Sequence, residues 1–235
     1  MVSPLFLDPH ELLPLIGTGQ APRLIDVCLA EDVAADPWRL PGAQHVSHGA
    51  IMQWAQGANR SAPVVIICQK GLKLSHGAAA RLRATGFDAR ALTGGNQGWQ
   101  DTNFPKVSLA GAPETGSIWV LPAPVTPQSL CLAWLIRRWF NPEAELIWVP
   151  QAMIGDVADR FDAEPASRTL LELCKRTALE YAPLVRFVSS VDANSAQWLP
   201  LLGPLVQRFD GAEAQLANAL PIIDAAWTAE REAGQ

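Results

Sequence analysis

The stretch Val64-Val65-Ile66-Ile67-Cys68-Gln69-Lys70-Gly71-Leu72-Lys73-Leu74-Ser75-His76-Gly77 decides the fold of the first half of the chain. Its first four residues are apolar β-formers preceded by Pro63, a pattern typical of a strand that is buried on both faces in a parallel sheet. A cysteine, a short basic loop and a helical pattern follow. The stretch therefore predicts a thiol where a strand gives way to a helix N-terminus, at which unpaired N–H groups and the helix dipole stabilise negative charge.

Short strand and helix patterns surround this stretch at the spacing of an α/β domain. The predicted elements are a helix from Asp8, a strand at 24–27, a helical turn at 51–56, a strand at 64–67, a helix at 75–85, a strand at 89–92 and a turn at 96–100. We therefore expect residues 1–110 to form a mostly parallel sheet flanked by helices, with its ligand beyond the carboxyl ends of the strands.

A proline-rich segment between Phe104 and Pro127 separates this pattern from the second half, residues 111–235. The second half is predicted to be a mainly helical α+β domain. Its predicted strands are 117–121 and 146–149, and its predicted helices are 127–140, 152–160, 167–179, 183–188, 197–209 and 212–232. Arg137 and Arg138 lie near the end of the first helix, where positive charge suits the helix dipole; an oxyanion site is the alternative.

The composition excludes several classes of protein. With 49% hydrophobic and 17% charged residues the chain is globular, and its nine tryptophans are expected mainly in the core. A net charge of −5 without a basic cluster predicts no nucleic-acid partner. The segment Met1–Ile16 lacks the basic region of a signal peptide, and no run of ~20 apolar residues is present, so we expect no membrane partner.

Cysteine usage indicates a reducing compartment. The four cysteines, at 28, 68, 131 and 174, form neither a CxxC pair nor a dense disulfide pattern. We therefore expect a cytoplasmic protein in which Cys131 and Cys174, which lie within apolar helical patterns, are buried. No cofactor and no metal site are predicted.

Residues 23–107 resemble the rhodanese superfamily of sulfurtransferases. The resemblance rests on motifs in the correct order, namely Leu24-Ile25-Asp26-Val27, Leu40-Pro41-Gly42-Ala43-Gln44-His45-Val46, Cys68-x-x-Gly71, Gly86-Phe87 and Gly94-Gly95-x-x-Gly98-Trp99. It implies that Cys68 is a nucleophile that takes a sulfane sulfur as a persulfide and passes it to a thiophilic acceptor. A buried structural thiol is the alternative for Cys68.

The loop after Cys68 is the predicted binding site for an anionic substrate. The residues assigned to it are Gln69, Lys70, Gly71, Leu72, Lys73, Leu74 and Ser75. Lys70 and Lys73 are expected to attract thiosulfate by charge, and a solvated charged loop is the alternative. Lys73 lies near where many rhodaneses have arginine, and an ammonium lacks the planar fork of a guanidinium.

The spacing within this loop leaves a second chemistry open. Ser75 is the seventh residue after Cys68, whereas shorter versions of the loop have serine at the sixth position. A longer loop admits a larger anion. A phosphatase-like, arsenate-reductase-like or chromate-directed use of the loop therefore stays an alternative, although the arginine expected of a phosphate cradle is missing.

Three further residues are assigned supporting roles. Asp26 is expected to satisfy backbone or arginine groups near the loop. Cys28 replaces an arginine common at that position in the family, and it is a candidate to resolve oxidised Cys68 into a disulfide, although simple packing is the commoner fate. His76 is interpreted as a surface residue or as a base. Ser75 is expected first as the N-cap of its helix.

Residues 115–235 resemble, less completely, the C-terminal domain of ChrB-type chromate-resistance proteins. The match lies at Trp134-Leu135-Ile136-Arg137-Arg138, Asn141-Pro142-Glu143-Ala144-Glu145 and Val149-Pro150, with a weaker one at Ile222-Ile223-Asp224-Ala225. Gln128-Ser129 and Leu132-Ala133 replace the Asp-Arg and Cys-Pro of that family, and its downstream histidine is missing, because all four histidines lie in the first half. The second domain is therefore interpreted as a degenerate copy that binds or scaffolds rather than reacts.

These observations predict a rhodanese-like sulfurtransferase fused to a degenerate ChrB-like domain, with a small sulfur-containing or oxyanion substrate and a link to chromate or other oxyanion stress. The alternative is a non-catalytic oxyanion or redox sensor in metal resistance. The sequence leaves the sulfur donor, the acceptor and the oligomeric state open.

Overall fold

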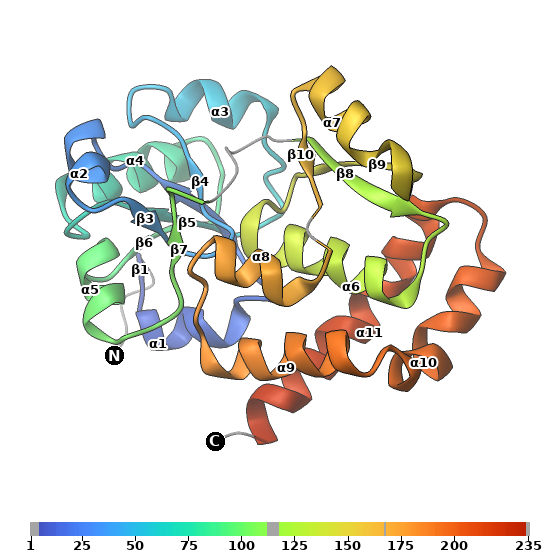
Figure 1. Ribbon diagram of the computed structural model, residues 1–235. Helices are drawn as coiled ribbons and strands as arrows, with labels where there is room; N and C mark the ends of the chain where they lie inside the picture. The colour runs from blue at the N-terminus through green and yellow to red at the C-terminus, as the bar shows by residue number, and fades with distance from the viewer. Residues whose placement is uncertain (1–4, 112–117, 167, 234–235) are drawn as a thin grey trace. The chain divides into compact units, whose positions relative to one another are not determined.

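The computed structural model describes residues 5–111, 118–166 and 168–233 (Figure 1). By its internal contacts the chain divides into two compact units. Unit 1 consists of Met1–Ile16 and Gln20–Ala110, and unit 2 consists of Gly17–Gly19 and Gly111–Gln235. Much of the predicted linker, residues 112–117, lies outside the described residues.

The sheet of unit 1 has five parallel strands in the order β1-β6-β5-β2-β4. In that order their bounds are Phe6–Leu7, Ala89–Leu92, Val64–Ile67, Arg23–Asp26 and Gln44–His45. The central strand β5 is buried along its whole length, as its continuous β-branched run predicts. The expected mostly parallel sheet is therefore confirmed.

Short helices flank this sheet. Their bounds are Pro9–Leu12 for α1, Leu13–Leu15 for the 3-10 helix η1, Ala30–Ala35 for α2, Ile51–Gly57 for α3, Lys73–Ala84 for α4 and Gly95–Asp101 for α5. Asp8 begins α1 with a reciprocal capping box to Glu11, which confirms the predicted helix start. A separate antiparallel pair joins β3, Trp38–Arg39, to β7, Val107–Ser108.

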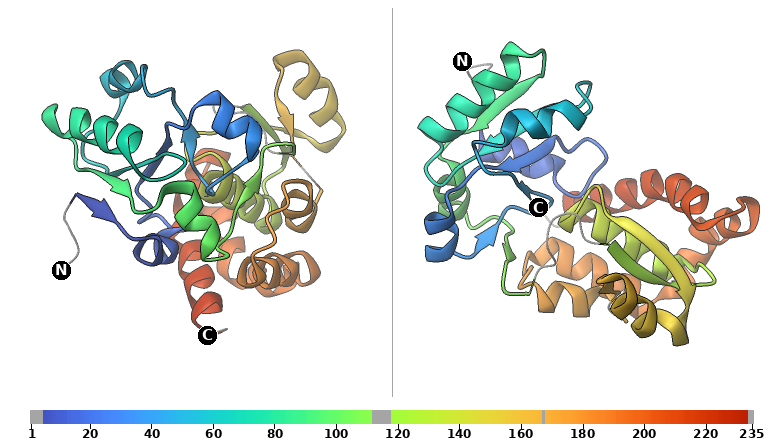
Figure 2. Two further views of the ribbon diagram at one scale, coloured as in Figure 1. Left: turned by 90° about the vertical axis from the view of Figure 1, so that its left-hand side faces the viewer. Right: turned by 90° about the horizontal axis from the view of Figure 1, so that it is seen from above.

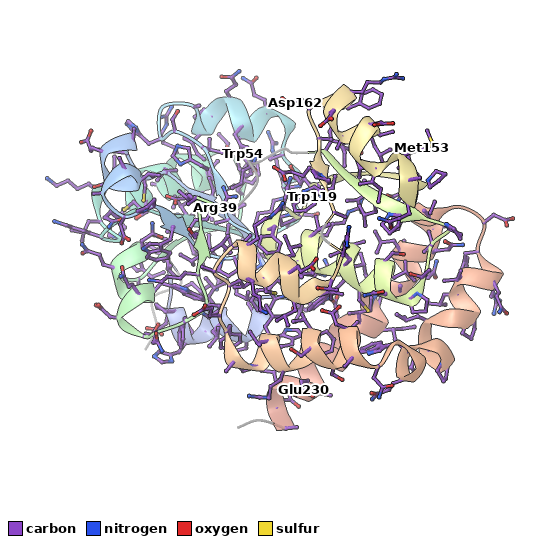
Figure 3. The ribbon with its side chains drawn as sticks, viewed as in Figure 1. Arg39, Trp54, Trp119, Met153, Asp162 and Glu230 are labelled. Atoms are coloured by element: carbon purple, nitrogen blue, oxygen red, sulfur yellow. The ribbon has the colours of Figure 1, made fainter. Side chains whose placement is uncertain are left out.

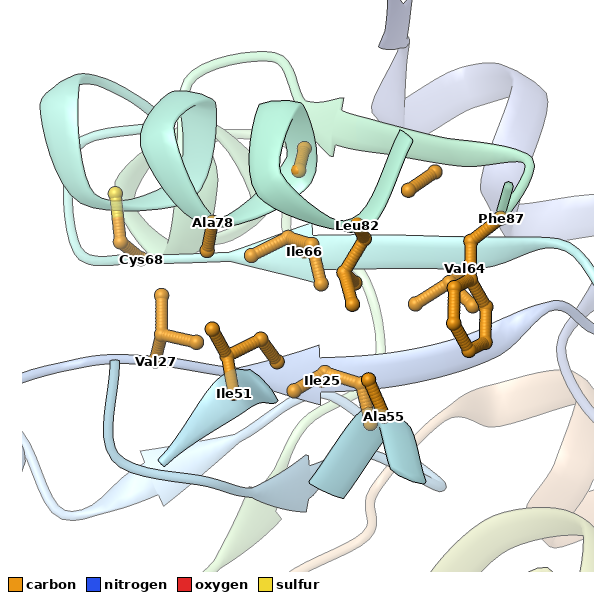
Figure 4. Close-up of a cluster of buried hydrophobic side chains, with 12 residues drawn as sticks. Ile25, Val27, Ile51, Ala55, Val64, Ile66, Cys68, Ala78, Leu82 and Phe87 are labelled. Carbon is orange, nitrogen blue, oxygen red and sulfur yellow. The ribbon is translucent and has the colours of Figure 1, made fainter. Parts of the chain in front are cut away.

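One apolar cluster connects the central strands of unit 1 to α3 and α4 (Figure 4). Ile25 and Val27 contribute to it from the β2 side, and Val64 and Ile66 contribute from β5. Figure 4 shows Cys68 at the end of this cluster, beside the first turn of α4. The packing of β5 and α4 against a common core therefore fixes where the thiol lies.

Two expectations about helix ends in unit 1 were wrong. Helix α4 begins at Lys73 and has Leu72 at its N-cap position, so Ser75 lies inside the first turn and is not the cap. The predicted turn at 96–100 is the helix α5, which starts at Gly95. Gly94 precedes it with φ of 71°, a left-handed conformation that lets the chain turn directly from β6 into a helix.

Unit 2 has a small parallel sheet and many helices, which confirms the predicted helix-rich α+β class. Its strands, in the order β10-β8-β9, are Glu164–Pro165, Ile118–Ala123 and Glu145–Pro150. Its helices are α6 Pro127–Leu135 with the π-helical continuation η2 Ile136–Phe140, η3 Gln151–Met153, α7 Ile154–Phe161, α8 Leu170–Arg176, α9 Ala182–Ala193, α10 Ser195–Arg208 and α11 Ala212–Ala233. Helices α6 and α11 lie side by side (Figures 1 and 2). Residue 117 of the predicted strand and residue 167 of the predicted helix lie outside the described residues.

Aromatic side chains build the interior of unit 2, as the tryptophan count predicts. Trp134, Trp139 and Trp227 are almost fully buried, and their rings contact one another or share neighbours such as Phe187. Trp119 on β8 is also buried within this unit (Figure 3). Cys131 and Cys174 are buried, as expected from their apolar helical surroundings.

Arg137 and Arg138 lie in the last turn of η2, and both form ion pairs. Arg137 pairs with Glu213 across 3.1 Å, and Arg138 pairs with Asp224 across 2.9 Å. Both guanidinium groups are therefore committed to carboxylates of the same unit, which leaves them poorly placed for the oxyanion site considered from the sequence. No helix in the described part of the chain is long and apolar enough to cross a membrane.

Candidate active site

Cys68 follows the last residue of β5 and is only 4% exposed. Its thiol donates a hydrogen bond to the hydroxyl of Ser75, with 3.2 Å between Sγ and Oγ. The Ser75 hydroxyl in turn donates to the carbonyl of Leu72 across 3.1 Å. The first turn of α4 therefore places a hydroxyl directly on the thiol, in spite of the long spacing in the sequence.

The backbone of the loop after Cys68 is rich in free donors. Apart from that of Gly71, the N–H groups from Gln69 to Ser75 have no acceptor within the part of the chain that the structure describes. They include the first N–H groups of α4, where the helix dipole favours negative charge. This loop is suited to hold a thiolate, a persulfide anion or an oxyanion.

The start of α5 holds the loop from its other side. The carbonyl of Cys68 accepts the N–H of Asn96 across 3.1 Å, and the carbonyl of Gln69 accepts the N–H of Gln97 across 3.0 Å. A Cβ on Gly95 would lie 1.9 Å from the Cys68 carbonyl oxygen, so only glycine fits at this approach. The carbonyls of Cys68 and Gln69 are therefore bound to α5, while the loop N–H groups other than that of Gly71 have no acceptor in the described chain.

The predicted substrate-binding side chains of the loop differ in exposure. Lys70 and Lys73 are exposed, Leu72 is 55% exposed, and Gly71 is buried with φ of 62°. A Cβ on Gly71 would lie 2.5 Å from the backbone nitrogen of Gly95. The two lysines thus remain in solvent, where they act on an approaching anion only through a screened charge.

His76 and Leu74 face inward more than the lysines do. Leu74 packs against the apolar cluster of unit 1. The ring of His76 contacts the ring of Phe6, with 4.8 Å between the centroids. His76 is therefore packed against β1, and its role as a base stays a prediction.

Asp26 and Cys28 lie at the end of β2, beside the loop. The Asp26 carboxylate accepts the backbone N–H of Cys28 across 2.8 Å. Burial lowers the pKa of the Arg39 guanidinium, and the negative charge of Asp26 opposes this shift. Burial, together with the charge of Asp26, raises the pKa of the Cys28 thiol, so Cys28 is held as the neutral thiol.

Cys28 contacts side chains other than Cys68. Strand β2 ends at Asp26, which pairs with Ile67 at the end of β5, and Cys28 follows two residues later. The Cys28 thiol lies 3.9 Å from the Gln69 carboxamide oxygen. It also accepts a hydrogen bond from the Asn96 carboxamide nitrogen across 3.3 Å. Cys28 is thus occupied by neighbours other than the Cys68 thiol.

Asn96 and Gly95 are site residues that the sequence reasoning did not assign. Asn96 is 4% exposed, and its carboxamide oxygen has no partner within the described chain. Both residues lie in the segment Gly94-Gly95-x-x-Gly98-Trp99, which was noted as a motif but not connected with the loop. The paired glycines Gly94 and Gly95 are the sequence signal for this contact, because glycine is typical of positions where two backbone segments approach closely.

The first half of the chain is similar to a known protein family. Residues 8–102 match the Rhodanese-like domain family. The thiosulfate sulfurtransferase GlpE of Pseudomonas putida strain GB-1 is 33% identical over 109 residues, which cover 46% of this chain and 94% of that protein. The protein of the same name from Pseudomonas fluorescens strain Pf0-1 is 36% identical over 76 residues, which cover 32% of this chain and 68% of that protein.

Solved structures also align with the chain. A rhodanese homologue from the extremely thermophilic bacterium Thermus thermophilus is 34% identical, with a TM-score of 0.32, and the alignment covers 40% of this chain and 98% of that one. A protein from Staphylococcus saprophyticus is 22% identical, with a TM-score of 0.37, and the alignment covers 42% of this chain and 95% of that one.

Proposed function

The chain belongs to the rhodanese-like family through residues 8–102, and we propose that it is a sulfurtransferase that carries a sulfane sulfur on Cys68. The donor we propose is thiosulfate or a related compound, because the relatives named above are thiosulfate sulfurtransferases. The proposal rests on the surroundings of Cys68. Its thiol bonds to Ser75 at the start of α4, among N–H groups without acceptors in the described part of the chain.

In the first step the thiolate of Cys68 attacks the outer sulfur of thiosulfate, after its proton has passed to solvent. The S–S bond of thiosulfate breaks, the bonding electron pair leaves with sulfite, and the persulfide Cys68–S–S⁻ remains. The free N–H groups between Gln69 and Ser75 supply hydrogen bonds to the anion at each stage. These donors are fixed by the bonds of the loop carbonyls to α5, so little reorganisation is needed.

In the second step a thiophilic acceptor attacks the terminal sulfur of the persulfide. The Cys68 thiolate leaves with the electron pair of the S–S bond, and the acceptor carries the sulfur away. Lys70 and Lys73 remain in solvent beside the loop and favour the approach of an anionic donor. Cys28 takes no part in either step, because its pKa is raised and it stays a thiol.

The test is sulfur transfer from thiosulfate to cyanide by the full chain. We expect thiocyanate to form, and we expect intact-protein mass spectrometry to find one added sulfur atom after incubation with thiosulfate alone. Both signals should disappear in Cys68→Ala. Cys174→Ala removes a thiol buried in unit 2 and serves as the matched control, which should keep both signals.

Two results would separate this proposal from the other uses of the loop. Absence of the added sulfur with thiosulfate and with other sulfane-sulfur donors would favour the oxyanion or redox sensor. Release of phosphate from an aryl phosphate that depends on Cys68 would favour the phosphatase-like alternative. The link of unit 2 to chromate stays a prediction from sequence resemblance, and comparing chromate tolerance of cells with and without the chain tests it.

A further inference from the structure

Unit 2 contains a cavity of about 230 Å³ at the edge of its own sheet. The cavity is lined by residues at the carboxyl end of each of the three strands: Pro122 is the last residue but one of β8, and Gln151 and Ala166 directly follow β9 and β10. From β8 the chain passes to β9 on one side of the sheet and then to β10 on the other. The strand order therefore reverses at β8, and such a reversal is where open parallel sheets bind ligands.

Polar and apolar groups divide the wall of this cavity. Gln128 and Gln151 contribute carboxamides, and Arg168 contributes a guanidinium. Leu132 and Ile154 belong to the aliphatic part of the wall. A ligand that fits must therefore combine a small apolar body with a group that accepts hydrogen bonds.

The charge of the lining is positive. Arg168 is the charged residue among those described that line the cavity, and its side chain is in no ion pair within the described chain. The residue is exposed, so its guanidinium is accessible to a ligand. The wall thus offers an anion one accessible guanidinium.

Two carboxylates that accept hydrogen bonds from cavity-lining residues are bound by backbone donors. Glu172 accepts the N–H groups of Arg168 and Thr169 at the start of α8. Asp192 accepts the N–H groups of Leu170 and Leu171, at 3.1 and 2.9 Å. Asp192 also accepts the carboxamide N–H of Gln128 across 3.5 Å, and neither carboxylate forms an ion pair with Arg168 within the described chain.

We propose that this cavity binds a small organic carboxylate. The planar guanidinium of Arg168 pairs with the carboxylate through two parallel hydrogen bonds, the carboxamide of Gln151 and the second N–H of the Gln128 carboxamide supply further donors, and the aliphatic wall covers a body of a few carbon atoms. The site is independent of Cys68. Under this proposal unit 2 binds a ligand and catalyses no reaction.

Titration of the full-length protein with isobutyrate and benzoate, followed by NMR of the side-chain amides, tests the proposal. We expect saturable shifts of the Gln128 and Gln151 signals below about 10 mM, an affinity reachable by a single charged contact with some apolar burial. Arg168→Gln should weaken binding at least about tenfold, and Arg168→Lys should weaken it less, because the ammonium keeps the charge but lacks the fork. Arg160→Gln, an exposed arginine of the same unit outside the cavity, is the control and should bind as the parent does.

Three outcomes would overturn the proposal. Absence of shifts with both carboxylates would show that the cavity takes no such ligand. Equal affinity in Arg168→Gln would remove the assigned charge contact. Sulfate that binds as tightly as benzoate would show that the aliphatic wall contributes nothing and that the site does not select organic carboxylates.

Discussion

The Cys68 thiol and the Ser75 hydroxyl are joined by a hydrogen bond of 3.2 Å, although seven positions separate the two residues in the chain. The contact exists because α4 begins at Lys73, which brings Ser75 onto the inner side of the first helical turn. In the thiolate or persulfide state the same hydroxyl can turn from the Leu72 carbonyl and donate to sulfur. Ser75 is therefore a specific donor to the proposed nucleophile.

Ser75→Ala is expected to slow sulfur transfer about 10- to 100-fold. A hydrogen bond to a charged group contributes about 1.5–3 kcal/mol, and each 1.36 kcal/mol changes a rate tenfold. Thiocyanate production at fixed pH measures the loss, and alkylation of Cys68 by iodoacetamide should slow in parallel. Ser47→Ala, at an exposed position, is the control. An unchanged alkylation rate in Ser75→Ala would mean that the hydroxyl does not assist the sulfur.

Gly95→Ala is expected to abolish most of the activity and to lower the melting temperature. Its Cβ would lie 1.9 Å from the Cys68 carbonyl and 2.4 Å from the Gly71 nitrogen, and its φ is 58°, so the loop must shift. Gly77→Ala makes the same change inside α4 with nothing within 4 Å of the new Cβ. There we expect a gain of about 0.5–1 kcal/mol in stability and full activity, since alanine favours a helix over glycine. Melting curves and thiocyanate assays are measured on both variants. They decide whether the loss of activity and stability comes from the close approach at Gly95 or from replacing any glycine by alanine.

The fold of unit 1 was predictable because its signals are local. The strand at Val64–Ile67 and the helix start at Asp8 each depend on neighbours in sequence, and the structure has both of them. The neighbours that fix the site come from far along the chain. Asn96 reaches Cys28 across 68 positions, and no sequence pattern names that partner.

Oxidation of the folded protein is expected to leave Cys28 and Cys68 unlinked. The Cys28 thiol is held by the carboxamides of Gln69 and Asn96, so it would have to leave both contacts to reach the Cys68 sulfur with disulfide geometry. Peptide mapping after treatment with diamide or peroxide tests this expectation, with a sample oxidised in urea as the positive control. A Cys28–Cys68 crosslink in the native sample would restore the role in resolving oxidised Cys68 that the sequence suggests.

The stability of unit 2 is expected to fall as pH rises above about 9, partly through Cys174. Burial, followed by the charge of Asp192, raises the pKa of this thiol from 9.0 to about 12. Between these values the unfolded chain loses the thiol proton while the folded chain keeps it, so the folded state is disfavoured as pH rises. The expected slope is about 1.4 kcal/mol per pH unit. Urea titrations at several pH values should show a slope in Cys174→Ala that is shallower by this amount, because other titrating groups cancel in the difference.

Two ion pairs of unit 2 are expected to contribute unequally to its stability. In the pair of Arg138 with Asp224 the side chains are 21% and 15% exposed, and Asp224 also accepts the indole N–H of Trp134 across 2.8 Å. Asp224→Ala leaves a half-buried guanidinium and a buried indole donor without their acceptor, so we expect a loss of about 3 kcal/mol.

Glu213→Ala is the matched comparison, because it removes the partner of the adjacent Arg137. Glu213 is 58% exposed, and Arg137 keeps hydrogen bonds to the Ala144 carbonyl, so water and backbone replace most of what is lost. We expect less than about 1 kcal/mol for this change. Urea denaturation followed by tryptophan fluorescence measures both variants. Equal losses would mean that burial does not decide the strength of these pairs, and that Asp224 is no more important to the fold than a surface carboxylate.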